Sequence, residues 1–173
     1  MVQVRGKYIT LVGRLMSLYK EALSEADEAL HKATGKHYEE VEPEGWYNKE
    51  LTVAFMNSYA EASPAGEKAL LTLGRNIYPT IKRTVGLPPE IQTPLDAILF
   101  EAEGYLRDHK GDGVIPRKFI QKQDRHVIVQ APSGYPPYFM EGVFLGILDM
   151  FGEIQGVVTL TKGDPEFEYD IKW

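Results

Sequence analysis

Basic and aromatic side chains in the second half of the chain could form a site for an anionic ligand. Arg75, Tyr78 and Lys82 follow one another at three- and four-residue steps, so on a helix they share one face. Arg117 and Lys118 add two cations on a predicted strand. This pattern predicts a pocket for an anionic or carboxylate-bearing ligand, because such side chains bind carboxylates well. The alternative is that the long basic side chains cover apolar surface with their stems.

Three further aromatic residues extend the candidate site. Trp46 and Tyr47 end a loop over 36–47 that contains proline and glycine, where they could close a hydrophobic pocket or anchor the loop to the core. Tyr138 follows two prolines at a rigid corner, which could equally be an interface. The predicted ligand-binding residues are Trp46, Tyr47, Arg75, Tyr78, Lys82, Arg117 and Tyr138.

The four histidines show no spacing that is typical of a metal site. His31 and His37 flank the end of a predicted helix, where such side chains interact favourably with exposed carbonyls. His109 has no second histidine four residues away, so we expect a solvated helix end rather than a metal or haem ligand. The chain has no cysteine, which excludes disulfides and thiolate ligands. The sequence therefore predicts no metal and no cofactor.

Residues for covalent catalysis are not brought together by any motif. Ser133 precedes Gly134, but no Gly-x-Ser-x-Gly pattern surrounds it. Glu166, Glu168 and Asp170 share one face of a predicted strand only because side chains alternate along it. We therefore predict that the protein is not an enzyme.

Length and composition restrict the class of protein. The 173 residues, 43% of them hydrophobic, fit one domain over 1–173 with a real core. A net charge of −6 argues against a general nucleic-acid binder. No apolar run reaches the ~20 residues of a membrane span, and the N-terminal residues lack a secretory signal pattern. The zero cysteine count also suits a reducing compartment, so we expect a cytoplasmic protein.

Apolar periodicity predicts helices in the first half of the chain. A long amphipathic helix carries its stripe from Tyr8 to Leu30 and ends at Gly35. Further helices are predicted after Asn48, after Ser63-Pro64 with a kink one turn before Pro79, and from Thr93 to about Asp108.

The second half predicts hairpin, helix, hairpin. Strands are expected over 115–122 and 125–131, a helix over 138–151, and a closing hairpin turning at Gly163-Asp164-Pro165. Phe167, Tyr169, Ile171 and Trp173 alternate with charged residues, which indicates one buried face. The sum is an α+β fold: N-terminal helices followed by β-β-α-β-β, with a four-stranded antiparallel sheet. Gly142 and Gly146 predict close backbone packing of the helix between the hairpins.

This order of elements, with Leu73-Gly74-Arg75 in a helix, resembles the four-vinyl-reductase-like domains of the TRAPP-like superfamily. The block 135–143 and the ending 163–173 are similar to theirs, and also to uncharacterised proteins abundant in myxobacteria. The resemblance covers about 46–173. It implies a domain that binds small hydrophobic ligands or protein partners, often as a sensor and often as a dimer.

Two features depart from known sensors. Aromatic-sensing relatives hold zinc with cysteines near the closing hairpin, and this chain has none. Haem-based nitric-oxide sensors share the helix-then-sheet layout and use a Tyr-x-Ser-x-Arg motif after the second strand for the haem propionates. Residues 130–135 read Gln-Ala-Pro-Ser-Gly-Tyr instead. Haem binding of that type is therefore not expected.

Together these features predict a non-enzymatic cytosolic sensory domain. Its ligand would be small and hydrophobic or carboxylate-bearing, in a mainly apolar pocket between helices and sheet. The signal would pass through a protein partner or a homodimer, without nucleic acid. The first alternative is an interaction scaffold with a filled core, and the second is a haem-based gas sensor or an enzyme.

Overall fold

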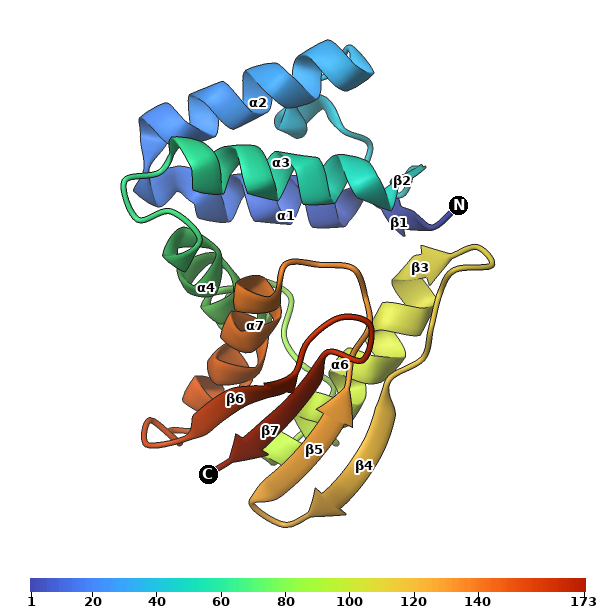
Figure 1. Ribbon diagram of the computed structural model, residues 1–173, viewed down its shortest axis with the longest axis vertical. Coiled ribbons are helices and arrows are strands. Elements are labelled where there is room, and N and C mark those ends of the chain that lie inside the picture. The colour runs from blue at the N-terminus through green and yellow to red at the C-terminus, as the bar shows by residue number, and fades with distance from the viewer.

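Three helices form an N-terminal layer in the computed structural model, which describes all 173 residues (Figure 1). They are α1 (Gly6–Leu15), α2 (Lys20–Thr34) and α3 (Lys49–Ala62), and the short 3₁₀ helix Met16–Leu18 joins the first two. The prediction of one continuous helix is wrong, because Tyr19 leaves helical geometry at φ −118° and ψ 85°. Both pieces bury a stripe of the same period, so periodicity does not reveal the break. Gly35 does end α2, with a left-handed φ of 72°.

A small sheet that the sequence did not predict lies beside this layer. It pairs β1 (Gln3–Arg5) with β2 (Trp46–Asn48) on one side and β3 (His109–Lys110) on the other, all antiparallel. Strands of two or three residues are too short to show an alternating pattern. The sheet ties the N-terminus to the end of a helix about a hundred residues later in the chain.

In place of the one kinked helix predicted from Ser63-Pro64 to Gly86 there are two helices, and the first of them begins only at Lys68. They are α4 (Lys68–Arg75) and α5 (Ile77–Thr84), and α6 (Pro94–Asp108) follows them. The break at Asn76 falls one turn before Pro79, whose ring clashes with the carbonyl four residues earlier. At the start of α6, Thr93 Oγ1 accepts from the Asp96 amide at 3.2 Å and Asp96 Oδ2 accepts from the Thr93 amide at 2.9 Å. The predicted capping box is confirmed.

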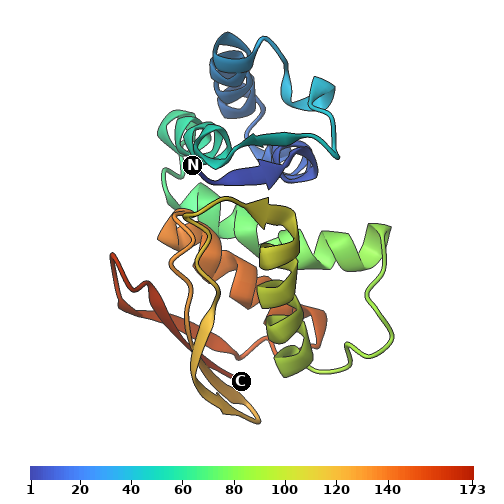
Figure 2. The same ribbon diagram turned by 90° about the vertical axis from the view of Figure 1, so that its right-hand side faces the viewer.

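The C-terminal part confirms the α+β prediction. Its strands are β4 (Lys118–Gln123), β5 (His126–Gln130), β6 (Val157–Lys162) and β7 (Glu168–Lys172), in the antiparallel order β4-β5-β7-β6. Helix α7 (Pro137–Met150) packs on this sheet, as Figures 1 and 2 show. Tyr169 and Ile171 are buried, and the Tyr169 ring lies 5.4 Å from that of Phe144 on α7. None of the helices is both long enough and apolar enough to cross a membrane.

Helices α4 and α7 touch through their backbones. A Cβ added at Gly142 would overlap with the carbonyl oxygen of Leu71, and one at Gly146 with that of Arg75. In the other direction, a Cβ at Gly74 would overlap with the Phe139 carbonyl oxygen. The predicted close packing of the glycine-bearing helix is confirmed, and its partner is α4.

Candidate functional site

A cavity of about 50 Å³ lies where the N-terminal layer meets the rest of the protein. Side chains from α1 and α3 line one side, and α5, α6, α7 and the segments around β3 and β4 line the other. Ten of its 14 lining residues are hydrophobic. The lining residues are Tyr8, Thr52, Met56, Ile77, Tyr78, Ile81, Glu101, Tyr105, His109, Arg117, Tyr135, Phe139, Met140 and Val143. Such an apolar pocket with a few polar groups is typical of a ligand site.

A buried ion pair forms the polar wall of this cavity. Arg117, directly before β4, donates from Nη2 to Glu101 Oε1 at 2.6 Å and from Nε to Oε2 at 3.2 Å. The two side chains are only 2% and 9% exposed. The guanidinium also lies 3.9 Å from the centre of the Tyr105 ring, a favourable cation–π arrangement. Glu101 stands on the buried face of α6, so the pair joins this helix to the start of the sheet.

Two buried polar atoms in the cavity wall have no hydrogen-bond partner, Arg117 Nη1 and Thr52 Oγ1. Buried polar atoms of this kind are rare in folded proteins, because each loses its hydrogen bonds to water. The phenols of Tyr8 and Tyr78 also line the cavity. Burial raises the pKa of Tyr8 above its ordinary value, and burial raises the pKa of Tyr78 well above it. Both phenols are therefore protonated near neutral pH.

His109 is buried at the edge of the cavity, so the prediction of a solvated helix end is wrong. Its Nδ1 lies 2.8 Å from the Tyr105 carbonyl oxygen and its Nε2 lies 2.8 Å from the Tyr135 hydroxyl. A carbonyl only accepts, so Nδ1 carries the proton and Nε2 accepts from Tyr135. Burial lowers the pKa of His109 to about 4. The ring is therefore neutral near pH 7. Strand β3, which carries His109, pairs with β1, and the Tyr8 ring meets the imidazole edge-on at 5.6 Å.

Two of the seven predicted ligand-binding residues, Tyr78 and Arg117, line the cavity. Arg75 instead pairs with Asp149 on α7, with Nη2 2.9 Å from Oδ1. Lys82 donates to the Met150 carbonyl at 2.9 Å, also on α7. The break at Asn76 thus puts Arg75 on a different helix from Tyr78. Lys82 shares α5 with Tyr78, but its amino group binds the end of α7.

The three other predicted aromatic residues lie away from the cavity lining. Trp46 sits on β2 between Arg5 and Lys110, whose charged groups lie 4.1 and 4.3 Å from its ring centre. The Tyr47 hydroxyl accepts from the Glu42 amide at 3.1 Å. Both residues therefore anchor the loop, which is the alternative reading of their sequence context. Tyr138, in the first turn of α7, is 39% exposed.

Four polar or titratable residues of the cavity lining were not predicted from the sequence as part of a binding site: Thr52, Glu101, His109 and Tyr135. Only Glu101 carried a usable signal, because it interrupts the apolar stripe of α6 next to Ile98 and Tyr105. A charge on the buried face of a helix predicts a buried partner. Thr52, His109 and Tyr135 are of residue types that occur both in cores and at surfaces, so their types alone do not predict a place in a cavity wall.

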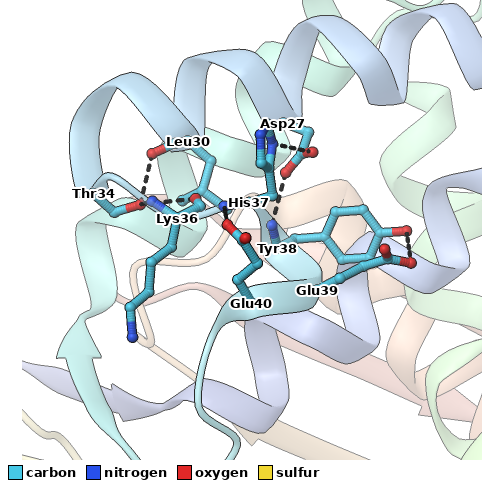
Figure 3. Close-up of polar contacts among 8 residues, drawn as sticks. All are labelled: Asp27, Leu30, Thr34, Lys36, His37, Tyr38, Glu39 and Glu40. Atoms are coloured by element: carbon cyan, nitrogen blue, oxygen red, sulfur yellow. Dashed lines mark hydrogen bonds and ion pairs between the residues drawn. The ribbon is translucent and has the colours of Figure 1, made fainter.

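His31, near the end of α2, and His37, in the loop that follows, lie close together, and Figure 3 shows the polar contacts that His37 and its neighbours make. The His31 and His37 rings stack at 4.2 Å, and Asp27 accepts from the Tyr38 amide at 2.8 Å and lies 2.9 Å from His37 Nδ1. Thr34 donates to the Leu30 carbonyl at 2.9 Å. No group of three or more potential metal ligands occurs here or elsewhere in the structure. These contacts fasten the loop after α2 to the helix.

Comparison with solved structures identifies the architecture. An H-NOX-family structure determined to probe haem distortion superposes with a TM-score of 0.71 at 16% identity, covering 98% of this chain and 94% of that chain. Unliganded Fe(II) H-NOX from K. algicida gives 0.66 at 14%, covering 97% and 95%. The oxygen complex of an oxygen-binding H-NOX domain related to soluble guanylate cyclases gives 0.64 at 14%, covering 94% and 90%.

The chain has the H-NOX fold. No family model matches the sequence, and no curated protein matches it. The resemblance to four-vinyl-reductase-like and TRAPP-like domains is wrong, because the matching structures described above are H-NOX domains over nearly the whole chain. The residues that suggested it form a helix contact, a proline corner and a closing hairpin. Such features serve packing in many α+β folds and do not discriminate between them.

Proposed function

We propose that this protein is a sensory domain that binds a small ligand in the cavity between its N-terminal layer and its C-terminal part. The observation that carries the proposal is the pair of buried atoms without partners, Thr52 Oγ1 on α3 and Arg117 Nη1 before β4. They come from the two sides of the cavity. A ligand hydrogen-bonded to both atoms would favour one packing of the N-terminal layer on the C-terminal part over others. A protein partner or a second copy of the chain would then bind that arrangement preferentially.

Haem is the ligand that the H-NOX fold suggests, but the residues present here do not fit it. His109 is the only histidine in the cavity lining. Its Nδ1 donates to a backbone carbonyl, so Nε2 is the nitrogen that would face a metal. Tyr135 occupies this lone pair at 2.8 Å, and haem iron would have to displace it.

The cavity volume and the lack of a free arginine for the haem propionates also argue against haem. A cavity of about 50 Å³ is far below the roughly 300–1,000 Å³ of sites for larger organic ligands. The Tyr-x-Ser-x-Arg pattern is absent from 130–135. The one arginine in the lining already binds Glu101 with two nitrogens. A haem-based gas sensor is therefore the weaker proposal.

The proposal is tested on the purified full chain. Haemin is added in excess, removed by gel filtration, and the absorption spectrum is compared with that of the T. tengcongensis H-NOX protein treated in the same way. We expect a Soret band from the H-NOX protein and none from this chain. One equivalent of haem retained by this chain, with a spectrum that shifts on adding nitric oxide, would replace our proposal with the gas sensor.

A second measurement addresses ligand binding directly. Native mass spectrometry and thermal unfolding are run with a collection of small polar and apolar metabolites. The expected result is a rise in unfolding temperature with a small compound, since a ligand that binds only the folded state stabilises it. If no compound binds, the protein is an interaction scaffold with a filled core.

A further inference from the structure

The free nitrogen of Arg117 defines what the cavity can bind. Glu101 takes Nε and Nη2, and the Tyr105 ring covers the guanidinium at 3.9 Å. The Arg117 guanidinium is therefore held in one orientation. Nη1 remains without a partner although the side chain is only 2% exposed. An arginine nitrogen only donates hydrogen bonds, so its missing partner is an acceptor.

The other polar groups around the cavity agree with an acceptor. Thr52 Oγ1 also lacks a partner, and a hydroxyl can donate as well as accept. Tyr8 and Tyr78 present protonated phenols, which are donors too. An oxygen-rich ligand satisfies these groups, whereas a ligand with only N–H groups does not satisfy Arg117.

The charges near the cavity tolerate one additional negative charge. Glu101 is balanced by Arg117 at 2.6 Å, and Asp108 is balanced by Lys7 at 2.7 Å. Lys49 is buried and donates to the neutral Ser133 carbonyl at 2.9 Å, and its anionic neighbour is the exposed Glu50 carboxylate at 3.6 Å. Burial of an anion requires such nearby positive charge and direct hydrogen bonds.

Size and apolar lining restrict the ligand further. A water needs roughly 10–15 Å³ of this kind of volume, so about 50 Å³ accommodates about three to five non-hydrogen atoms. Met56, Ile77 and Met140 belong to the apolar majority of the lining. A fully polar anion such as nitrate would leave this part of the cavity unused, whereas a short alkyl chain fills it.

We propose that the cavity binds a short-chain monocarboxylate of about four or five non-hydrogen atoms, with its carboxylate on Arg117 Nη1 and Thr52 Oγ1. This inference rests on the proposed sensory function and names its ligand class. The apolar tail lies toward α5 and α7.

The test is calorimetric titration of the full chain in Tris buffer with acetate, propionate, butyrate and hexanoate, and with propionamide as the neutral analogue. We expect the tightest binding for acetate or propionate, which have four and five non-hydrogen atoms, with a dissociation constant below about 1 mM for so small a ligand. Hexanoate exceeds the cavity, so its binding falls. Propionamide binds at least about tenfold more weakly than propionate, because hydrogen bonds to a charged group are stronger than those to a neutral one.

Two variants separate binding from folding. Thr52→Val removes one hydroxyl and keeps the shape of the side chain, so the protein folds and carboxylate affinity falls about tenfold. The double variant Arg117→Met, Glu101→Leu removes both buried charges together, which proteins tolerate better than removing one, and abolishes binding. Arg75→Met is the matched control, because Arg75 pairs with Asp149 outside the cavity; its affinity stays at the wild-type value.

Several results would overturn the inference. Carboxylates that bind Thr52→Val and the double variant as tightly as wild type do not use this cavity. If a neutral compound binds and no carboxylate does, the ligand class is wrong while the sensory proposal stands. If no small molecule of any class binds, the cavity holds only water and both proposals fail.

Discussion

Arg117 and Glu101 form a two-pronged ion pair inside the protein, with Nη2–Oε1 and Nε–Oε2 distances of 2.6 and 3.2 Å. The two residues are 16 positions apart, one on α6 and the other before β4. Their side chains are 2% and 9% exposed. The pair neutralises two charges that could not be buried singly, and it holds the guanidinium whose Nη1 has no hydrogen-bond partner.

Removing one member of this pair should destabilise the protein strongly. Arg117→Met leaves the Glu101 carboxylate buried without a partner, and we expect a loss of about 3–5 kcal/mol in the free energy of unfolding. Arg75→Met, which breaks a half-exposed pair with Asp149, should cost about 1 kcal/mol or less. Urea unfolding measures both. Equal losses for the two variants would show that the buried pair is not protected from water.

Stability should fall in acid because of His109. Burial lowers its pKa from 6.5 to about 4, so between these values the unfolded chain binds a proton that the folded protein does not. This contribution is complete above pH 6.5 and decreases as the pH falls, by roughly 3 kcal/mol at pH 4. Urea unfolding across this range should show a shallower slope for His109→Gln than for wild type. His31→Gln, which alters a half-buried ring stacked on His37, is the matched control. A His109→Gln slope that equals the wild-type slope would contradict the assignment.

The Tyr135 hydroxyl should contribute measurably through its bond to His109. Tyr135→Phe removes the donor 2.8 Å from Nε2 and leaves that nitrogen buried without a partner. We expect a loss of about 1–3 kcal/mol in the free energy of unfolding. Tyr38→Phe is the control, since its hydroxyl bonds Glu39 at the exposed surface, and it should change stability by less than about 0.5 kcal/mol. A loss confined to Tyr38→Phe would refute the role of Tyr135.

The contact between α4 and α7 should tolerate no side chain at Gly142. Gly142→Ala places a methyl group against the Leu71 carbonyl oxygen, and the helices must separate. The expected cost is about 1–3 kcal/mol or more, read as a lower midpoint in urea. Gly163→Ala is the matched control, because nothing lies within 4 Å of the added carbon. A neutral Gly142→Ala would mean that the two backbones are farther apart than described.

Signals that act over a few residues predicted much of the secondary structure correctly. Thr93 and Asp96 cap α6 through groups three residues apart. Pro79 interrupts the helix at Asn76, one turn earlier in the sequence. The alternating final strand also lies where its pattern indicated, with Tyr169 and Ile171 buried. These features depend on backbone geometry and periodicity, which neighbouring residues determine.

The same local signals failed where distant segments meet. Tyr19 interrupts a stripe whose period continues on both sides. Strand β3 forms only because it pairs with β1, and this pairing covers His109, which its neighbours Asp108 and Lys110 made look exposed. The resemblance to another superfamily rested on residues that serve packing, so it could not distinguish one α+β fold from another.

By itself the sequence determined the α+β class, the order hairpin, helix, hairpin in the second half with its four-stranded sheet, and the absence of thiol chemistry. It also selected Tyr78 and Arg117 as candidates for binding. Only the tertiary structure decided that these two share a cavity with Thr52 and Glu101, and that Arg75 and Lys82 do not. The physical reason is that hydrogen bonds and burial depend on distances in space, and the pair of His109 and Tyr135 spans 26 positions that no local pattern connects.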